Sequence, residues 1–286
     1  MNIVVFDTET TSIEKPFCYN IGYKIANIES GDVLVKRDFV VEQVWHNPML
    51  FTTAYYSNKR DVYVSRMKAK KCVMEKFGYI TQQMIRDFKA YEVELAFAYN
   101  SPFDKGVFEF NCEWFKCNNP FDDLEIKDIM NYVHTFIAFR EEYQQFLENA
   151  YIEFGNKIKQ VKEQVIEEEE KEKALKFWKE RQARVFTESG NYSTSAENVF
   201  CYMSNNLDFI EEHTALADSE IEFEILRTCI VEYGAEINGN YKRYSSIPRK
   251  ISKELKVIDT DGNEHIFKYG KRRNYQDGNK IILKNY

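Results

Sequence analysis

The first forty residues alternate short apolar runs with turn-forming residues, a pattern typical of consecutive β-strands. Residues 3–6 form a short apolar run, and residues 19–28 and 33–41 follow it with the character of strands. The connection over residues 29–32 is short and contains a glycine, so the second and third strands are expected to form a hairpin. The chain therefore opens as a β-meander.

Helical spacing and further apolar runs alternate after this meander. Residues 79–91 place Ile80, Met84 and other apolar side chains on one side of a helix. Residues 95–99 form another short apolar run, which we interpret as a central strand, and residues 103–110 return to the helical period. Strands interleaved with helices indicate an α/β fold rather than a helical bundle or a β-sandwich.

Composition excludes several other classes of protein. With 44% hydrophobic and 30% charged residues, the chain is too apolar to be disordered and too polar to be an integral membrane protein. The apolar N-terminus ends at once in acids and has no preceding basic region, so it does not resemble a signal peptide. Of the six cysteines only Cys112 and Cys117 lie close together, without a nearby histidine for a zinc site. Reduced thiols in a cytoplasmic protein are the expectation.

A charged segment interrupts the α/β pattern. Residues 139–186 alternate blocks of Glu and Lys between regularly spaced apolar residues. This pattern predicts a helical insertion of one or two long amphipathic helices, with an antiparallel hairpin as one arrangement. Such a charge run serves either as a solvated face or as a surface that binds a protein partner.

The C-terminal region has the opposite charge balance. From Asn240 onward there are 12 lysines and arginines and five acids, a local net charge near +7 in a chain whose net charge is −7. Strand patterns at residues 256–258 and 266–269 surround a turn at 261–263 and predict a small basic β-rich appendage. Its interleaved aromatic and basic side chains could stack on bases and bind a phosphate backbone. A basic surface that binds no ligand explains the same pattern equally well. These side chains are Tyr241, Lys242, Arg243, Tyr244, Tyr269, Lys271, Arg272, Arg273 and Tyr275.

Two carboxylates follow the first apolar run. Asp7 and Glu9 are two residues apart in FDTET, and side chains two apart on a strand project to the same face. Two acids would therefore lie side by side at the edge of a buried sheet. Acids are also common where a strand meets a turn, so this pair alone does not define a site.

Two more acids fall on apolar helical stripes. Asp104 shares a helix face with Val107 and Phe108, and Asp218 shares one with Ile221. A carboxylate on a core-facing stripe is costly unless something neutralises it. A first-turn Asp at a helix N-terminus is the ordinary alternative.

A histidine lies close to the last of these acids. Thr214 is the expected N-cap of a helix that runs through Ile230, so His213 precedes this helix. His213 and Asp218 are separated by about 140° of helical turn, so the histidine would reach the same pocket only from the side. A lone histidine before a helix is more often a cap or surface residue.

Taken together, the four acids predict a metal site. Four carboxylates packed within a few ångströms would repel one another strongly. Two divalent cations would neutralise them and form a clamp suited to phosphoryl displacement. Oxygen ligands favour Mg²⁺ or Mn²⁺ over zinc. In this arrangement His213 would accept the proton of the attacking water.

These motifs resemble those of the DEDDh exonucleases, which include proofreading subunits of bacterial replicative polymerases, ribonuclease T and oligoribonuclease. FDTETT is similar to the first motif of the family, NSPFD to the second, and HTALAD to the third. The resemblance covers residues 1–236 apart from the insertion, and leaves 237–286 as the appendage. It implies a ribonuclease-H-like fold, with a mixed central sheet flanked by helices. It also implies 3′–5′ release of nucleoside 5′-monophosphates from single-stranded DNA ends.

The same resemblance assigns a role to each matching residue. The metal ligands would be Asp7, Glu9, Asp104 and Asp218, with His213 as the general base. The residues next to the terminal nucleotide would be Thr8, Thr10, Thr11, Ile13, Asn100 and Phe103, whereas Asp128 is interpreted as structural. The implied partner is a nucleic acid with a single-stranded 3′ end, and the implied location is the cytoplasm, that of the host if the origin is viral.

Three features depart from the family pattern. Ser12 stands where the family usually has glycine, the gap between Asp104 and His213 is long, and the basic C-terminal region is additional. They leave the substrate open. A ribonuclease, a nuclease of short oligonucleotides, and a non-catalytic nucleic-acid-binding protein are the alternatives.

Overall fold

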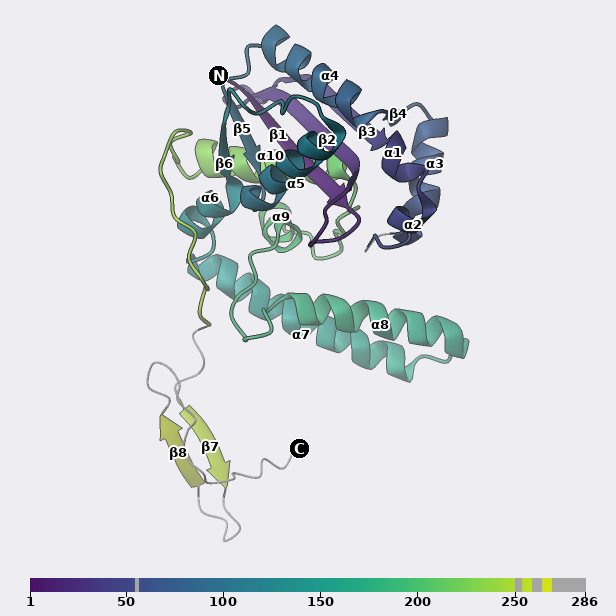
Figure 1. The fold of residues 1–286 in the computed structure, drawn as a ribbon. Coiled ribbons are helices and arrows are strands. Elements are labelled where there is room, and N and C mark those ends of the chain that lie inside the picture. Colours follow the sequence, from purple (N-terminus) through teal and green to yellow (C-terminus); the bar gives the residue numbers. More distant parts are fainter. Residues whose placement is uncertain (55–56, 250–253, 259–263, 269–286) are drawn as a thin grey trace. The chain divides into compact units, whose positions relative to one another are not determined.

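The computed structural model describes residues 1–54, 57–249, 254–258 and 264–268. The chain divides into two compact units, Met1–Ile247 and Pro248–Tyr286, whereas the resemblance places the end of the main domain at residue 236. In the first unit a six-stranded sheet has the order β4-β3-β2-β1-β5-β6 (Figure 1). Its strands are β1 (Asn2–Thr10), β2 (Cys18–Asn27), β3 (Val33–Val41), β4 (Val73–Glu75), β5 (Leu95–Ala98) and β6 (Glu125–Asp128).

The predicted meander and hairpin are confirmed. β1, β2 and β3 pair antiparallel, whereas β5 pairs parallel with β1, β6 with β5, and β4 with β3. β1 is longer than the apolar run that predicted it, because its partner β2 continues the ladder as far as Thr10. Asp7 and Glu9 therefore lie near the end of β1, three residues and one residue before Thr10 ends the strand.

Helices cover both faces of this sheet. Alternate side chains of β1 point to opposite faces, so that Val4 and Phe6 join one apolar core and Ile3 and Val5 join the other. Helices α4 and α5 contribute to the first core, and α6, α7, α9 and α10 contribute to the second. The helices are α1 (Glu42–Trp45), α2 (Pro48–Phe51), η1 (Ser57–Lys59), α3 (Arg60–Lys68), α4 (Phe77–Ala90), α5 (Ser101–Phe115), α6 (Ile129–Phe136), α7 (Glu141–Glu163), α8 (Glu168–Arg184), α9 (Ala196–Ser204) and α10 (Ala215–Val231).

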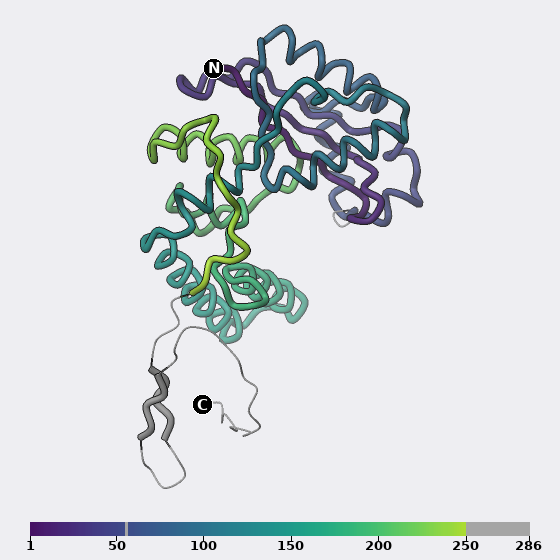
Figure 2. The backbone as a smooth tube through the Cα atoms, turned by 60° about the vertical axis from the view of Figure 1, so that its left-hand side comes forward, coloured from purple at the N-terminus to yellow at the C-terminus, as the bar shows by residue number. Residues whose placement is uncertain are grey.

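The charged insertion is a pair of helices. α7 and α8 lie side by side in both views and form an antiparallel hairpin (Figures 1 and 2). Their apolar faces meet through rings such as those of Phe154 and Trp178, whose centroids are 5.8 Å apart. The four consecutive acids at residues 167–170 are exposed, as a solvated face requires.

The sheet order and strand directions define a mixed α/β architecture that is compatible with a ribonuclease-H-like fold. Within the described part of the chain, none of the helices has both the length and the apolar character needed to cross a bilayer. All six cysteines are free thiols.

The C-terminal region is organised differently from the expectation. Tyr241 and Tyr244 belong to the first unit, where Tyr241 packs against Tyr132 and Tyr244 packs against His134 and Phe139. Because their rings pack against α6 and the residues that follow it, Tyr241 and Tyr244 are part of the first unit rather than of an appendage. The second unit contains a β-hairpin of β7 (Glu254–Ile258) and β8 (Glu264–Lys268). The expected turn and the expected ligand residues Tyr269, Lys271, Arg272, Arg273 and Tyr275 lie outside the described residues.

Candidate metal centre

Strand β1 presents two carboxylates toward helix α10. Asp7 and Glu9 follow Ile3 and Val5 on the same face of the strand, and this face forms the core to which α10 contributes. Glu9 is 9% exposed, and its carboxylate accepts a long hydrogen bond of 3.4 Å from the hydroxyl of Tyr19. The two acids therefore lie on one face of the strand, with Glu9 buried and Asp7 partly buried.

Helix α10 brings a third carboxylate to this pair. Asp218 is 6% exposed and lies on the stripe with Ile221 and Ile225, as its spacing predicted. Carboxylate oxygens of Asp7, Glu9 and Asp218 all lie within 4.8 Å of one another. Among the described residues, Oδ1 of Asp218 is buried and has no hydrogen-bond partner. Because a buried carboxylate oxygen without a partner is costly, this atom is suited to a cation.

Asp104 approaches from helix α5. It is 2% exposed, and its Oδ1 accepts a hydrogen bond of 2.6 Å from the hydroxyl of Thr8 on β1. It lies outside the group formed by Asp7, Glu9 and Asp218. Its charge nevertheless acts on Asp7, since Asp104 raises the pKa of that carboxyl after the larger effect of burial.

His213 lies in the loop before α10 and reaches the centre from the side. Glu211, His213 and Asp218 form a second group whose ligating atoms lie within 4.8 Å, so that Asp218 is common to both groups. The Nδ1 atom of His213 is 3.6 Å from a carboxylate oxygen of Glu211. The backbone of His213 has a φ of +50°, a left-handed conformation that few residues other than glycine adopt.

The electrostatics of this centre favour the binding of protons or cations. Burial raises the pKa of Asp218 to about 10, and the nearby Asp7 acts in the same direction. Burial likewise raises the pKa of Asp104 to about 7 and that of Glu211 to about 7. The pKa of Glu9 is raised by burial and by Asp7. A divalent cation would neutralise these carboxylates in place of protons.

Cationic groups lie beside the acids. Burial lowers the pKa of His213 to about 4, and the positive charges of Lys59 and Arg184 act in the same direction. The positive charge of Lys59 also lowers the pKa of Glu9 and Asp218. His213 is therefore a neutral imidazole near pH 7, as a proton acceptor must be.

The donor set fits a hard divalent cation. Three carboxylates that share one small region, one of them with an unpartnered oxygen, match the oxygen ligands that Mg²⁺ and Mn²⁺ prefer. Two overlapping groups with Asp218 in common are compatible with more than one cation. Asp7, Glu9 and Asp218 are thus the residues that would hold a metal, with Glu211 and His213 beside them.

The expected substrate residues Thr10, Thr11 and Ile13 lie where β1 passes into a loop: Thr10 ends the strand, and Thr11 is buried. Thr10 and Thr11 donate hydrogen bonds to backbone carbonyls of this loop, at 3.3 and 3.4 Å. Ile13 is 85% exposed. The loop therefore presents an apolar side chain to solvent close to Asp7 and Glu9 in sequence.

The residues that begin α5 have structural contacts. Asn100 is in a left-handed conformation before the helix, and its side-chain oxygen accepts a hydrogen bond of 2.6 Å from Arg243. Phe103 packs against the first apolar core. Asp128 accepts hydrogen bonds from the backbone amides of Asn100 and Met130, and so it caps α6 and holds the turn before α5.

A buried asparagine that the sequence analysis missed anchors α10. Thr214 is the N-cap residue of α10, as expected, but its side chain makes no capping hydrogen bond. Instead, the amide of Ala215 donates to Oδ1 of Asn20 on β2 at 2.8 Å. Asn20 in turn donates to Asp38 and to the carbonyl of Phe39, at 2.7 and 2.8 Å. This network fixes the start of the helix that carries Asp218.

A glycine allows α10 to approach the sheet closely. Gly22 on β2 pairs with Asp7, and a Cβ atom at this position would lie 2.0 Å from the backbone nitrogen of Leu216. Such a distance is impossible without displacing the helix. Gly22 therefore sets the separation between Asp7 and the first turn of α10.

We expect Gly22→Ala to lower the free energy of unfolding by at least about 1–3 kcal/mol, because α10 must move away from β2. Displacement of Asp218 should also weaken binding of Mn²⁺ measured by titration calorimetry. Gly106→Ala is the matched control, since nothing lies within 4 Å of the added methyl group on α5. This control should be neutral or more stable by up to about 1 kcal/mol. Equal effects of the two substitutions would contradict the close approach.

Another acid lies beneath the centre. Glu222 is one helical turn after Asp218, is 3% exposed, and accepts a hydrogen bond of 3.4 Å from the amide of Tyr99. Burial raises its pKa well above the usual range, and Asp7 and Asp104 act in the same direction. Glu222 thus adds to the acidic character of this region of the core.

Comparison with known proteins adds no assignment for this centre. Neither a protein-family model nor a curated protein matches the chain. What the centre does must therefore be inferred from the chemistry of its own residues.

Proposed function

We propose that the protein is a metal-dependent 3′–5′ exonuclease that hydrolyses phosphodiester bonds at single-stranded DNA ends. One observation carries this proposal: the carboxylates of Asp7, Glu9 and Asp218 lie within 4.8 Å of one another, and Asp218 also belongs to a group with His213. The mixed sheet supports it, because it is compatible with the ribonuclease-H-like fold that the resemblance to DEDDh exonucleases implies.

Each group has a role that follows from its position. Asp7, Glu9 and Asp218 would hold divalent cations, with Asp104 adding negative charge beside Asp7. When bound, such cations supply positive charge to the phosphate and lower the pKa of a water. The neutral imidazole of His213 would accept the proton of the attacking water.

Cations of the chain itself would bind the nucleic acid. Lys59 and Arg184 act electrostatically on the residues of the centre, Lys59 on Glu9 and Asp218 and both on His213. An ammonium and a guanidinium at the border of an acidic site would attract the phosphates of a strand that the net charge of −7 otherwise repels.

The decisive experiment is digestion of a 5′-labelled single-stranded DNA with Mg²⁺, with Mn²⁺ and with EDTA. We expect a ladder that shortens from the 3′ end, release of nucleoside 5′-monophosphates, and no digestion in EDTA. Asp7→Ala should abolish the activity, because it removes a ligand from the carboxylate group. Robust digestion by Asp7→Ala would contradict the proposal.

The substrate class is tested in the same assay. RNA and di- to tetranucleotides are digested in parallel, because recognition of the 2′-hydroxyl depends on contacts that sequence motifs do not define. Faster turnover of RNA or of short oligonucleotides would replace DNA as the substrate. Binding of strands without turnover under every metal would favour a non-catalytic nucleic-acid-binding protein instead.

A further inference from the structure

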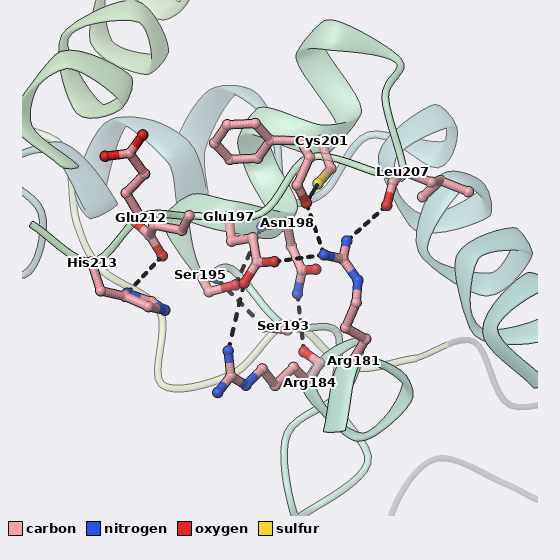
Figure 3. Close-up of polar contacts among 12 residues, drawn as sticks. Arg181, Arg184, Ser193, Ser195, Glu197, Asn198, Cys201, Leu207, Glu212 and His213 are labelled. Carbon is pink, nitrogen blue, oxygen red and sulfur yellow. Dashed lines mark hydrogen bonds and ion pairs between the residues drawn. The ribbon is translucent and has the colours of Figure 1, made fainter. Parts of the chain in front are cut away.

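The loop between α9 and α10, residues 205–214, carries Glu211 and His213. A loop lacks a regular ladder, so its backbone carbonyls need other partners. The guanidinium of Arg181 supplies two of them, since Nη2 donates to the carbonyl of Leu207 at 2.7 Å and Nη1 to that of Phe209 at 2.8 Å. Figure 3 shows this guanidinium between Leu207 and the side chain of Glu197.

Arg181 belongs to the helical insertion and lies in the last turn of α8. It is only 9% exposed, although α8 is otherwise a charged and solvated helix. Its guanidinium is 3.2 Å from a carboxylate oxygen of Glu197 and lies over the ring of Phe154, 5.0 Å from the centroid. The planar guanidinium binds the two carbonyls through separate nitrogens at a fixed spacing, which the single nitrogen of an ammonium does not provide.

The far end of the same loop is held by other elements. Lys59 on η1 donates to the carbonyl of Glu212, and Arg66 on α3 lies 3.5 Å from the carboxylate of Glu212. The amide of Ala215 is bound by Asn20. The chain between these anchors contains His213, whose left-handed backbone conformation is costly and must be maintained by its surroundings.

We propose that Arg181 is a positioning residue for this centre, so that the helical insertion contributes to the geometry of the site. By fixing the carbonyls of Leu207 and Phe209, Arg181 holds the loop that places Glu211 and His213 beside Asp218. The catalytic part of this inference rests on the proposed exonuclease function. The anchoring of the loop by the insertion does not.

The test compares Arg181→Lys with Lys173→Ala in the full chain. Lys keeps a positive charge beside Glu197 but lacks the two separate nitrogens that bind the carbonyls, so we expect kcat to fall about 10–100-fold with KM changed less than about threefold. Hydrogen exchange of the amides of residues 205–214 should become faster. Lys173 lies on the same helix, where it is exposed and pairs with Glu169 at 2.6 Å, so its replacement should change neither quantity.

A rescue experiment separates positioning from loss of fold. Arg181→Ala should regain kcat and slow loop exchange when millimolar methylguanidinium is added, whereas Lys173→Ala should not respond. A lower melting temperature of Arg181→Lys with unchanged kcat and unchanged loop exchange would overturn the proposal. If the wild-type protein digests no strand under any metal, the exonuclease function falls, and loop exchange alone then decides whether Arg181 anchors the loop.

Discussion

Asp218→Asn is expected to abolish turnover and, in EDTA, to make the protein more stable. The substitution removes a carboxylate shared by both groups of candidate metal ligands, so activity should fall by at least about 100-fold. It also removes a buried carboxyl whose ionisation is opposed by burial and by Asp7, Glu211 and Glu9. Asparagine is neutral without binding a proton, so the substitution should raise the free energy of unfolding in EDTA near pH 7 by about 1–3 kcal/mol.

The dependence of this stability on pH has a definite sign. Burial and Asp7 raise the pKa of Asp218 from 3.8 to about 10, so the folded protein holds a proton that the unfolded chain releases. Between these two values the folded state binds more protons than the unfolded state, and stability falls as the pH rises. In EDTA the wild-type protein should therefore lose stability from about pH 5 to about pH 9, and Asp218→Asn should lose less. Mg²⁺ should restore the wild-type stability at the higher pH.

Thermal melts with and without Mg²⁺ across this pH range measure the effect. Asp208→Asn is the control, because Asp208 is an exposed acid of the loop before α10. It should neither stabilise the protein in EDTA nor reduce the effect of Mg²⁺. A lower melting temperature of Asp218→Asn in EDTA, or a wild-type protein that Mg²⁺ does not stabilise, would be incompatible with a cation site.

Periodicity alone predicted which acids are buried. Strand alternation placed Asp7 and Glu9 on one face, and helical spacing placed Asp104 and Asp218 among apolar neighbours, where both are at most 6% exposed. These are local properties, because they depend only on residues a few positions apart. The same reasoning could have found Glu222, which shares the stripe of Asp218 and was missed.

The supports of the centre could not be predicted in this way. Asn20 bonds to Ala215 across 195 residues, and Gly22 matters because α10 packs against β2 at that point. In the sequence, nothing distinguishes Arg181 from the other charged residues of a solvated helix. Only its contacts with Leu207 and Phe209 in the structure do so. Each of these contacts depends on tertiary packing, which no local pattern encodes.

His213→Asn is expected to lower kcat by about 10²–10⁴-fold while cation binding persists. The imidazole is the only histidine side chain in the two candidate groups, and its low pKa leaves it neutral and able to accept a proton. Asp7, Glu9 and Asp218 remain in the variant, so stabilisation by Mg²⁺ should be retained. Asparagine is chosen because it tolerates the positive φ of this position better than alanine.

The pH profile distinguishes loss of a base from loss of structure. Burial, Lys59 and Arg184 lower the pKa of His213 to about 4, so the wild-type rate should fall only at acidic pH, below the ordinary histidine range. The residual rate of His213→Asn should not fall at acidic pH in this way.

If His213→Asn instead keeps the wild-type rate, the proton must pass to another group. Glu211 then becomes the candidate, because burial and Glu197 raise its pKa to about 7, near that of an effective base at neutral pH. Glu211→Gln in the same assay would decide between the two residues.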